Sequence, residues 1–309
     1  MTEQTNTVIV QDQKIPPANF IGEESLPISS MWHDTVRRFK HNRLAVIGLV
    51  IMIATIVMCV FAPFFTSYDP VLDMNLKNCL LPTGSPGHLL GTDDYGRDIL
   101  SRLLYGGRVS LITGLVVSVI TMAIGVLIGC ISGYFGGWLD NLLMRIVDIF
   151  LAFPFLVLAI AIMAALGPSQ RNIVITLVIV GWPSFARLTR GQILALKETE
   201  YIEAARASGF SHGRIMFYHI LPNALAPIIV MATLKIGGTI MSAASLNFLG
   251  LGVDSSLPEW GVMLNQARDY MTSAPHLSIY PGLAISLTVL SMNWIGDGLR
   301  DALDPRMRK

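Results

Sequence analysis

Residues 203–209 have the sequence Glu-Ala-Ala-Arg-Ala-Ser-Gly, and Asn223 follows after thirteen further residues. This polar stretch of small residues lies between two apolar segments of a chain that is mostly apolar. A membrane protein has little reason to keep such a loop unless a partner docks on it, because lipid offers polar groups no partners. We therefore predict that the loop is a docking surface for a soluble partner. An ordinary connecting loop is the alternative.

The composition indicates a membrane protein. Of the 309 residues, 52% are hydrophobic and 14% are charged, and the mean hydropathy is +0.57. Soluble domains carry about 25% charged residues. The formal net charge of +1 argues against a nucleic-acid-binding protein that relies on bulk electrostatics.

Six segments are apolar enough to cross a bilayer, which takes about 20 residues per helix. They are residues 44–65, 109–133, 142–166, 173–188, 224–251 and 277–295. The fourth is the weakest because it is short and contains Pro183. Spanning segments must satisfy their own backbone groups, so we predict an all-α, polytopic fold with six transmembrane helices.

Basic residues near the segment ends predict the orientation. They precede the first segment, surround the 203–209 loop and close the chain: Arg37, Arg38, Lys40, Arg43, Arg187, Arg190, Lys197, Arg206, Arg214, Arg300, Arg306, Arg308 and Lys309. We expect cytoplasmic tails at 1–43 and 302–309, a cytoplasmic loop at 195–223, and an external loop with a surface helix at 66–108. The basic residues of that external loop argue the other way, but the even number of spans places it outside.

The chain carries few signatures of chemistry. No Gly-Lys pair is present, so the usual phosphate-binding loop is missing, and no His-Glu pair begins a zinc-protease helix. The three cysteines, Cys59, Cys79 and Cys130, form neither a disulfide framework nor a zinc pattern. The first thirty residues lack the basic start and apolar core of a cleaved signal. We predict no catalytic residue, no metal site and no cofactor bound by this chain.

Residues 209–213 match the pattern Gly-x-Ser-x-Gly, which marks the nucleophile of some hydrolases. That nucleophile requires a preceding strand, whereas residues 198–208 are good helix formers. The pattern is better explained by a short helix over 198–208 that ends at Gly209 in the left-handed conformation. Ser211 then caps the next helical piece, and Pro222 marks the boundary before the fifth span.

Three glycines recur at every fourth position of the second span: Gly125, Gly129 and Gly133. This spacing places them on one helix face, where the lack of side chains lets another helix approach closely. We predict tight packing within the bundle at this face, and a moving or pore-lining contact is the alternative.

With these elements in place, the loop resembles the EAA loop of bacterial ABC importer permeases. The similarity lies in Glu203-Ala204-Ala205, in Gly209, and in Leu221-Pro222 at the expected distance. In that family the loop forms a coupling helix that sits in a groove of the ATPase subunit. The resemblance implies that the ATPase-coupling residues are Glu203, Ala204, Ala205, Gly209, His219, Leu221, Pro222 and Asn223. His219 departs from the general pattern of the family at this position. A His-x-Leu-Pro-Asn sequence, as in residues 219–223, is typical of the subgroup that imports peptides and nickel.

Further stretches resemble the C-type permease subunits of that subgroup, with dipeptide permeases the most similar. They are residues 91–98, 101–102, 106–111, 248–252, 258–261 and 296–305, and the resemblance covers roughly 32–309. It implies a type I ABC importer fold with a permease core at 109–301, in a bacterial inner membrane. It also implies a homologous B-type permease, two ATPase subunits that bind ATP and Mg²⁺, and an external peptide-binding protein. The alternatives are a permease for nickel complexes or glutathione, and a secondary transporter or channel without an ATPase.

Two further groups of residues are candidate functional residues. Lys235 is a charge deep within a span, which costs about 2.5–3.5 kcal/mol on insertion scales, so it should face the bundle, a water-filled path or a partner. Its counterpart is either a structural acid or the carboxylate of a peptide. Asp93, Asp94, Arg97 and Asp98 lie at an expected external helix start, with Thr92 or Asp93 as the cap. They are candidates for an external gate or a contact with the binding protein.

Overall fold

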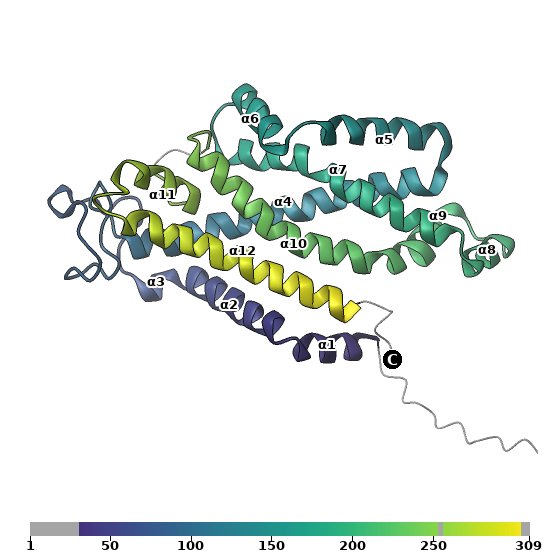
Figure 1. Ribbon diagram of the computed structural model, residues 1–309, viewed down its shortest axis with the longest axis horizontal. Helices are drawn as coiled ribbons and strands as arrows, with labels where there is room; N and C mark the ends of the chain where they lie inside the picture. The colour runs from purple at the N-terminus through teal and green to yellow at the C-terminus, as the bar shows by residue number, and fades with distance from the viewer. Residues whose placement is uncertain (1–30, 253–255, 304–309) are drawn as a thin grey trace, which may run out of the picture.

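The computed structural model describes residues 31–252 and 256–303, so most of the two expected tails lies outside the described residues. All regular elements in this part of the chain are helices. The long helices run roughly along the long axis of the molecule (Figure 1). The helices α1, α8 and α9 lie at one end, and α11 lies with the loop before α4 at the other.

Five helices are long and apolar enough to cross a membrane. They are α2 (Arg43–Val60), α4 (Ile99–Phe135), α7 (Gln170–Lys197), the continuous run of α9 (His212–Arg214), η2 (Ile215–Ile220) and α10 (Leu221–Phe248), and α12 (His276–Leu303). A sixth span is formed if α5 (Gly137–Ala152) and α6 (Phe155–Leu166) cross together. Shorter helices are α1 (Met31–His41), α3 (Ala62–Phe65), η1 (Leu76–Asn78), α8 (Glu200–Ala207), α11 (Trp260–Ala267) and η3 (Arg268–Tyr270).

The third predicted span is broken rather than continuous. The axes of α5 and α6 differ by 92° across the break at Phe153 and Pro154. A proline disfavours the helical conformation of the residue before it, and Phe153 is extended, with φ −90° and ψ 141°. The sharp bend therefore follows from one Phe-Pro pair, which the hydropathy of the segment conceals.

The fourth and second spans are longer than the sequence indicates. The helix α7 continues through Pro183, which is buried inside it. Within membranes, neighbouring helices make an internal proline tolerable. The helix α4 begins at Ile99 rather than at 109, and its N-cap is Asp98, which accepts a hydrogen bond from the Ser101 N–H at 2.8 Å. Neither Thr92 nor Asp93 is the cap, and residues 99–108 continue into the span instead of forming a separate surface helix.

The three glycines of α4 pack against α7, as their spacing predicts. A Cβ atom on Gly125 would lie 2.8 Å from the carbonyl oxygen of Trp182, and one on Gly129 would lie 2.6 Å from that of Ala186. At Gly133 the corresponding distance, to the carbonyl oxygen of Arg190, is 3.1 Å. The two backbones therefore approach too closely for any side chain on this face.

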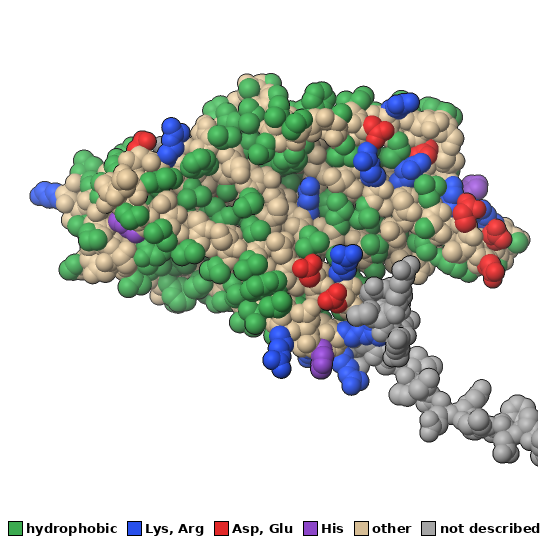
Figure 2. All heavy atoms as spheres, viewed as in Figure 1, with side chains coloured by type: hydrophobic (Ala, Val, Ile, Leu, Met, Phe, Trp, Pro, Cys, Tyr) green, Lys and Arg blue, Asp and Glu red, His purple; other side chains and the backbone are tan. Residues whose placement is uncertain are grey.

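The surface agrees with a membrane environment. Large apolar side chains of α2 point outward; for example, Val50 is 60% exposed and Ile53 is 52% exposed. Hydrophobic side chains dominate the middle of the face shown in Figure 2, and charged side chains gather mainly toward the end that carries α1 and α8. Such an apolar middle, in helices of this length, is typical of a chain that crosses a bilayer.

Gly129→Ala should destabilise the helix pair, because the added methyl group meets the α7 backbone. Overpacking of this kind costs about 1–3 kcal/mol, so the melting temperature of the detergent-purified protein should fall. Gly191→Ala is the matched control, since a Cβ atom there meets nothing within 4 Å. Equal melting temperatures for the two variants would contradict a close contact between α4 and α7.

Candidate functional site

The helix α8 is attached to the bundle by one apolar face. Ile202 is fully buried and Ala205 is 7% exposed, and both join a cluster that includes Phe185, Ile193 and Ile220. That cluster draws on α4, α7, η2 and α10. Glu203 and Ala204 lie on the opposite, exposed face of α8. Of the loop residues expected to couple, Ala205 therefore anchors the helix, and Glu203 and Ala204 remain open to a partner.

The C-terminal end of α8 follows the sequence prediction, whereas the helix starts at Glu200 rather than at Glu198, which is the C-cap of α7. Gly209 has φ +77°, the left-handed conformation that ends a helix without strain only at glycine. Ser211 then caps α9, where its side chain accepts a hydrogen bond from the Arg214 N–H at 3.4 Å. Because a helix precedes Ser211, the Gly-x-Ser-x-Gly pattern lacks the strand that a nucleophile elbow needs.

Side-chain contacts hold the segment after α8 against the start of α10. The His219 ring stacks on that of Phe210, with ring centroids 5.5 Å apart. The Asn223 side-chain amide donates to the His219 carbonyl at 2.7 Å and to the Tyr201 hydroxyl at 3.4 Å. Asn223 therefore links α8 to α10. Leu221 is half-buried and Pro222 is exposed in the first turn of α10.

The segment between α9 and α10 is a π-helix, Ile215–Ile220, which the sequence does not indicate. Its residues Ile215, Met216 and Ile220 are buried in the same cluster as Ile202. A π-helix widens the turn by one residue, and such turns are frequent at functional sites. Here it lets the chain run from α9 into α10 without a break.

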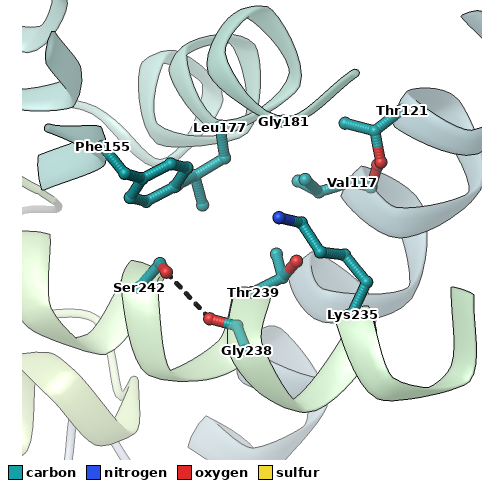
Figure 3. Close-up of a pocket in the computed structure, with 9 residues that line it drawn as sticks. All are labelled: Val117, Thr121, Phe155, Leu177, Gly181, Lys235, Gly238, Thr239 and Ser242. Atoms are coloured by element: carbon teal, nitrogen blue, oxygen red, sulfur yellow. Dashed lines mark hydrogen bonds between the residues drawn. The ribbon is translucent and has the colours of Figure 1, made fainter. Parts of the chain in front are cut away.

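A cavity of about 170 Å³ lies in the middle of the bundle between α4, α6, α7 and α10 (Figure 3). Lys235 of α10 is half-buried, and its amino group points into this space. The amino nitrogen lies 5.7 Å from the centroid of the Phe155 ring. The other wall residues are Val117, Thr121, Leu177, Gly181, Gly238, Thr239 and Ser242.

A buried ion network holds the end of the bundle opposite α8. Asp93 accepts hydrogen bonds from the backbone N–H of Arg97 at 2.9 Å and from its Nε at 2.7 Å. The Nε of Arg102 lies 3.4 Å from the same carboxylate, and both arginines are 1% exposed. Asp98 caps α4 and pairs with Nδ1 of His88 at 3.0 Å.

This burial separates the four residues that the sequence grouped together as candidates for an external contact. Asp93, Arg97 and Asp98 are buried and occupied by partners within the chain, whereas Asp94 is half-buried. Burial, together with the negative charge of Asp93, raises the pKa of Asp94. Of the four, only Asp94 is accessible enough to be proposed as a contact for an external protein. Asp93, Arg97 and Asp98 instead hold the loop before α4 in place.

Glu259 is a buried residue whose role the sequence did not reveal, although it lies in one of the motif stretches. Its carboxylate accepts four hydrogen bonds, from the Ser110 hydroxyl at 2.7 Å, the Asn247 amide at 2.9 Å, and the backbone N–H groups of Gly261 and Val262 at 2.7 and 3.0 Å. Burial raises the pKa of Glu259, and these hydrogen bonds oppose the shift. The residue joins α11 to α4 and α10.

No arrangement in the described residues points to metal chemistry. No group of three or more His, Cys, Asp or Glu side chains in residues 31–252 and 256–303 is placed to hold a metal ion. The features that stand out are an anchored, exposed helix at one end, a cavity containing Lys235 in the middle, and a loop held by buried ion pairs at the other end.

These features define a membrane-embedded transport subunit. Residues 125–309 match the family model for the binding-protein-dependent transport system inner membrane component, and residues 30–82 match the N-terminal transmembrane domain of oligopeptide transport permease C. The chain belongs to this family of inner-membrane permeases.

The chain is 46% identical to the dipeptide transport system permease protein DppC of Alkalihalophilus pseudofirmus, over 99% of both chains. It is 44% identical to the glutathione transport system permease protein GsiD of Pectobacterium atrosepticum, over 91% of this chain and 93% of the relative. Among solved structures, the inward-facing MetNI methionine ABC transporter aligns with a TM-score of 0.53 and 20% identity. That alignment covers 65% of this chain and 96% of the MetNI chain, and it confirms the type I importer permease fold.

Asp93→Asn should destabilise the end of the bundle opposite α8, because it leaves two buried guanidinium groups without their carboxylate. Breaking a buried ion pair by removing one partner costs about 3–5 kcal/mol. We expect a clear fall in the melting temperature of the purified protein. Asp94→Asn is the control, and it should change little because the native site already disfavours the charged form of Asp94. Similar losses in both variants would contradict the central role of Asp93.

Proposed function

We propose that this chain is the C-type permease subunit of an ATP-driven importer that carries dipeptides and other short peptides across a bacterial inner membrane. The observation that carries the proposal is α8, a short helix anchored by Ile202 and Ala205 with an exposed polar face at one end of the bundle. The names of the relatives, a dipeptide permease and a glutathione permease, support short peptides as the substrate class.

The same proposal includes the partners. One permease chain of this kind pairs with a homologous B-type permease to enclose a path. Two ATPase subunits bind ATP and Mg²⁺ and dock on α8, and an external binding protein delivers the peptide. The exposed charges of α8 favour such docking, since Glu203 and Arg206 form no ion pair within 4.0 Å in the described part of the chain.

The positions of α1, α8 and α12 support a proposed orientation of the chain. The helix α1, α8 and the last turn of α12 all lie at the same end of the bundle, opposite the loop before α4 (Figure 1). The basic residues concentrate at this end, which favours a cytoplasmic location. Both termini and the 195–223 loop are then cytoplasmic, and the 66–98 segment and α11 are external.

The contacts of α8 suggest how nucleotide drives transport. ATP binding closes the two ATPases, which move α8. Because Ile202 and Ala205 pack against α7, η2 and α10, these helices move with α8 and open the path outward. The binding protein releases its peptide, and hydrolysis returns the bundle to the inward-open state. Nucleotide acts by favouring one of two conformations, so the ATPases must interact differently with α8 in each.

A secondary transporter or channel is the competing class. Such proteins place ionisable residues in mid-membrane as relays. Here both aspartates of α5 are paired with arginines of α7, Asp148 with Arg187 at 2.6 Å and Asp140 with Arg190 at 2.6 Å, which favours a structural role over a relay. Copurification distinguishes the two classes, because a secondary transporter would not bring ATPase subunits with it.

Gly209→Pro and Glu203→Arg should each abolish peptide uptake without lowering the amount of protein in the membrane. Proline requires φ near −65°, whereas Gly209 has φ +77°, and Glu203→Arg reverses a charge on the docking face. Coupling energies of this kind correspond to about 5–150-fold changes, so uptake should fall by at least about fivefold. Gly213→Ala is the control, since a Cβ atom there meets nothing within 4 Å. Normal uptake by both test variants would exclude α8 from coupling.

A thiol placed at Ser211 should be protected from a membrane-impermeant reagent in intact cells and labelled after lysis. The reference is Leu89→Cys in the opposite loop, where the native side chain is 66% exposed, and it should be labelled in intact cells. Both are made in a Cys79→Ser background, because Cys59 and Cys130 are buried and Cys79 is partly accessible. Labelling of Ser211→Cys from outside would reverse the orientation and remove the basis for ATPase coupling.

A further inference from the structure

Lys235 lies in the middle of α10, where its amino group faces a cavity rather than a paired acid. Figure 3 shows the side chain extending into the cavity between α4 and α7. The ring of Phe155, at the start of α6, is 5.7 Å from the amino nitrogen. An aromatic face attracts a cation without consuming its hydrogen-bond donors, so the three N–H donors of Lys235 stay available.

The acid that the sequence suggested as a structural partner is not found in residues 31–252 and 256–303. Every ion pair within 4.0 Å in this part of the chain joins other residues, and Lys235 belongs to none of them. No aspartate or glutamate lines the cavity. The electrostatic character of the cavity wall is therefore positive, because Lys235 is the charged group among the lining residues.

The remaining polar groups of the wall are hydroxyls that already have partners within the chain. Thr121 donates to the carbonyl of Val117 at 2.8 Å, and Ser242 donates to that of Gly238 at 2.8 Å. Thr239 lies 3.4 Å from the Ser118 hydroxyl. These hydroxyls supply no counter-charge, which leaves Lys235 as the group that would bind an entering anion.

The size of the cavity limits what can enter. Sites that enclose a whole drug-sized ligand measure about 300–1,000 Å³, whereas this cavity measures about 170 Å³. It suits one carboxylate with the adjoining part of a small molecule. A carboxylate would accept charge-assisted hydrogen bonds from the amino group, which are stronger than those between neutral groups.

We propose that Lys235 and this cavity form an anion subsite that binds the carboxylate of the substrate during translocation. The inference rests on the proposed import of peptides, and it adds a selectivity for carboxylate within the permease itself. Phe155 holds the ammonium by its ring when the subsite is empty, and the substrate carboxylate takes its place as the partner. Lys235 is thereby a specificity-determining residue of the path.

The test compares uptake of Ala-Ala with uptake of its C-terminal amide, in cells that carry the complete importer and no other peptide permease. Wild type is compared with Lys235→Met, which keeps most of the side-chain volume, and with Lys235→Arg, which keeps the charge. Lys40→Met is the matched control, because Lys40 is exposed on α1, outside the membrane-spanning helices. The ratio of the two uptake rates cancels differences in expression.

Lys235→Met should lower Ala-Ala uptake about tenfold, as expected for the loss of a hydrogen-bonded charge, and leave uptake of the amide within about twofold of wild type. Lys235→Arg should retain most of the preference for the free carboxylate, and Lys40→Met all of it. Equal loss for both peptides would assign Lys235 to an acid of the second permease or to folding, and would overturn the subsite. Unchanged uptake of both peptides by Lys235→Met would overturn the subsite as well. Failure of wild type to import either peptide would refute the proposed function itself, and the subsite with it.

Discussion

The close approach of α4 and α7 is the contact on which the rest of the bundle depends. Gly125, Gly129 and Gly133 present bare backbone to α7, and a side chain on any of them would collide with or crowd that helix. In lipid, helices gain little from burying apolar side chains, so dense backbone packing has to stabilise their association. The cavity next to Lys235 is lined by these same two helices and by α6 and α10. The contact between α4 and α7 therefore also fixes the positions of the groups that line the cavity.

The two ends of the bundle are held together by different kinds of contact. At the end opposite α8, Asp93 with its two arginines and Glu259 with its four donors bind loops and helix ends through buried polar groups. Such groups are costly unless every partner is present, which specifies one arrangement. At the other end, α8 is held mainly by apolar packing of Ile202 and Ala205 and by the hydrogen bonds of Asn223. Apolar contacts are non-directional, so this end can follow a moving partner without breaking a charged network.

The proposed coupling and the proposed anion subsite share one helix. The helix α10 begins at Leu221, next to the α8 contacts, and carries Lys235 near its middle. Phe155, which lines the same cavity as Lys235, comes directly after the bend between α5 and α6. A displacement of α8 passed along α10 would therefore change the distance between Lys235 and the helices that face it, which links the hold on a substrate to the state of the ATPases.

The sequence by itself determined the fold class, the approximate spans, the glycine face of α4, the end of α8 at Gly209 and the cap of the next helix at Ser211. Each of these depends on local periodicity or on the backbone freedom of single residues. It also indicated the family, since short motifs keep their order along the chain. Only the tertiary structure decided that Ala205 is an anchor, that Asp93, Arg97 and Asp98 are buried, and that Lys235 faces a cavity without an acid among its lining residues. Burial and pairing are set by residues far apart in the chain, such as Ser110 and Glu259, and no local pattern encodes which of them meet. The bend at Phe153 and Pro154 lies between these cases: its cause is local, but a sum of hydropathy over the segment cannot show it.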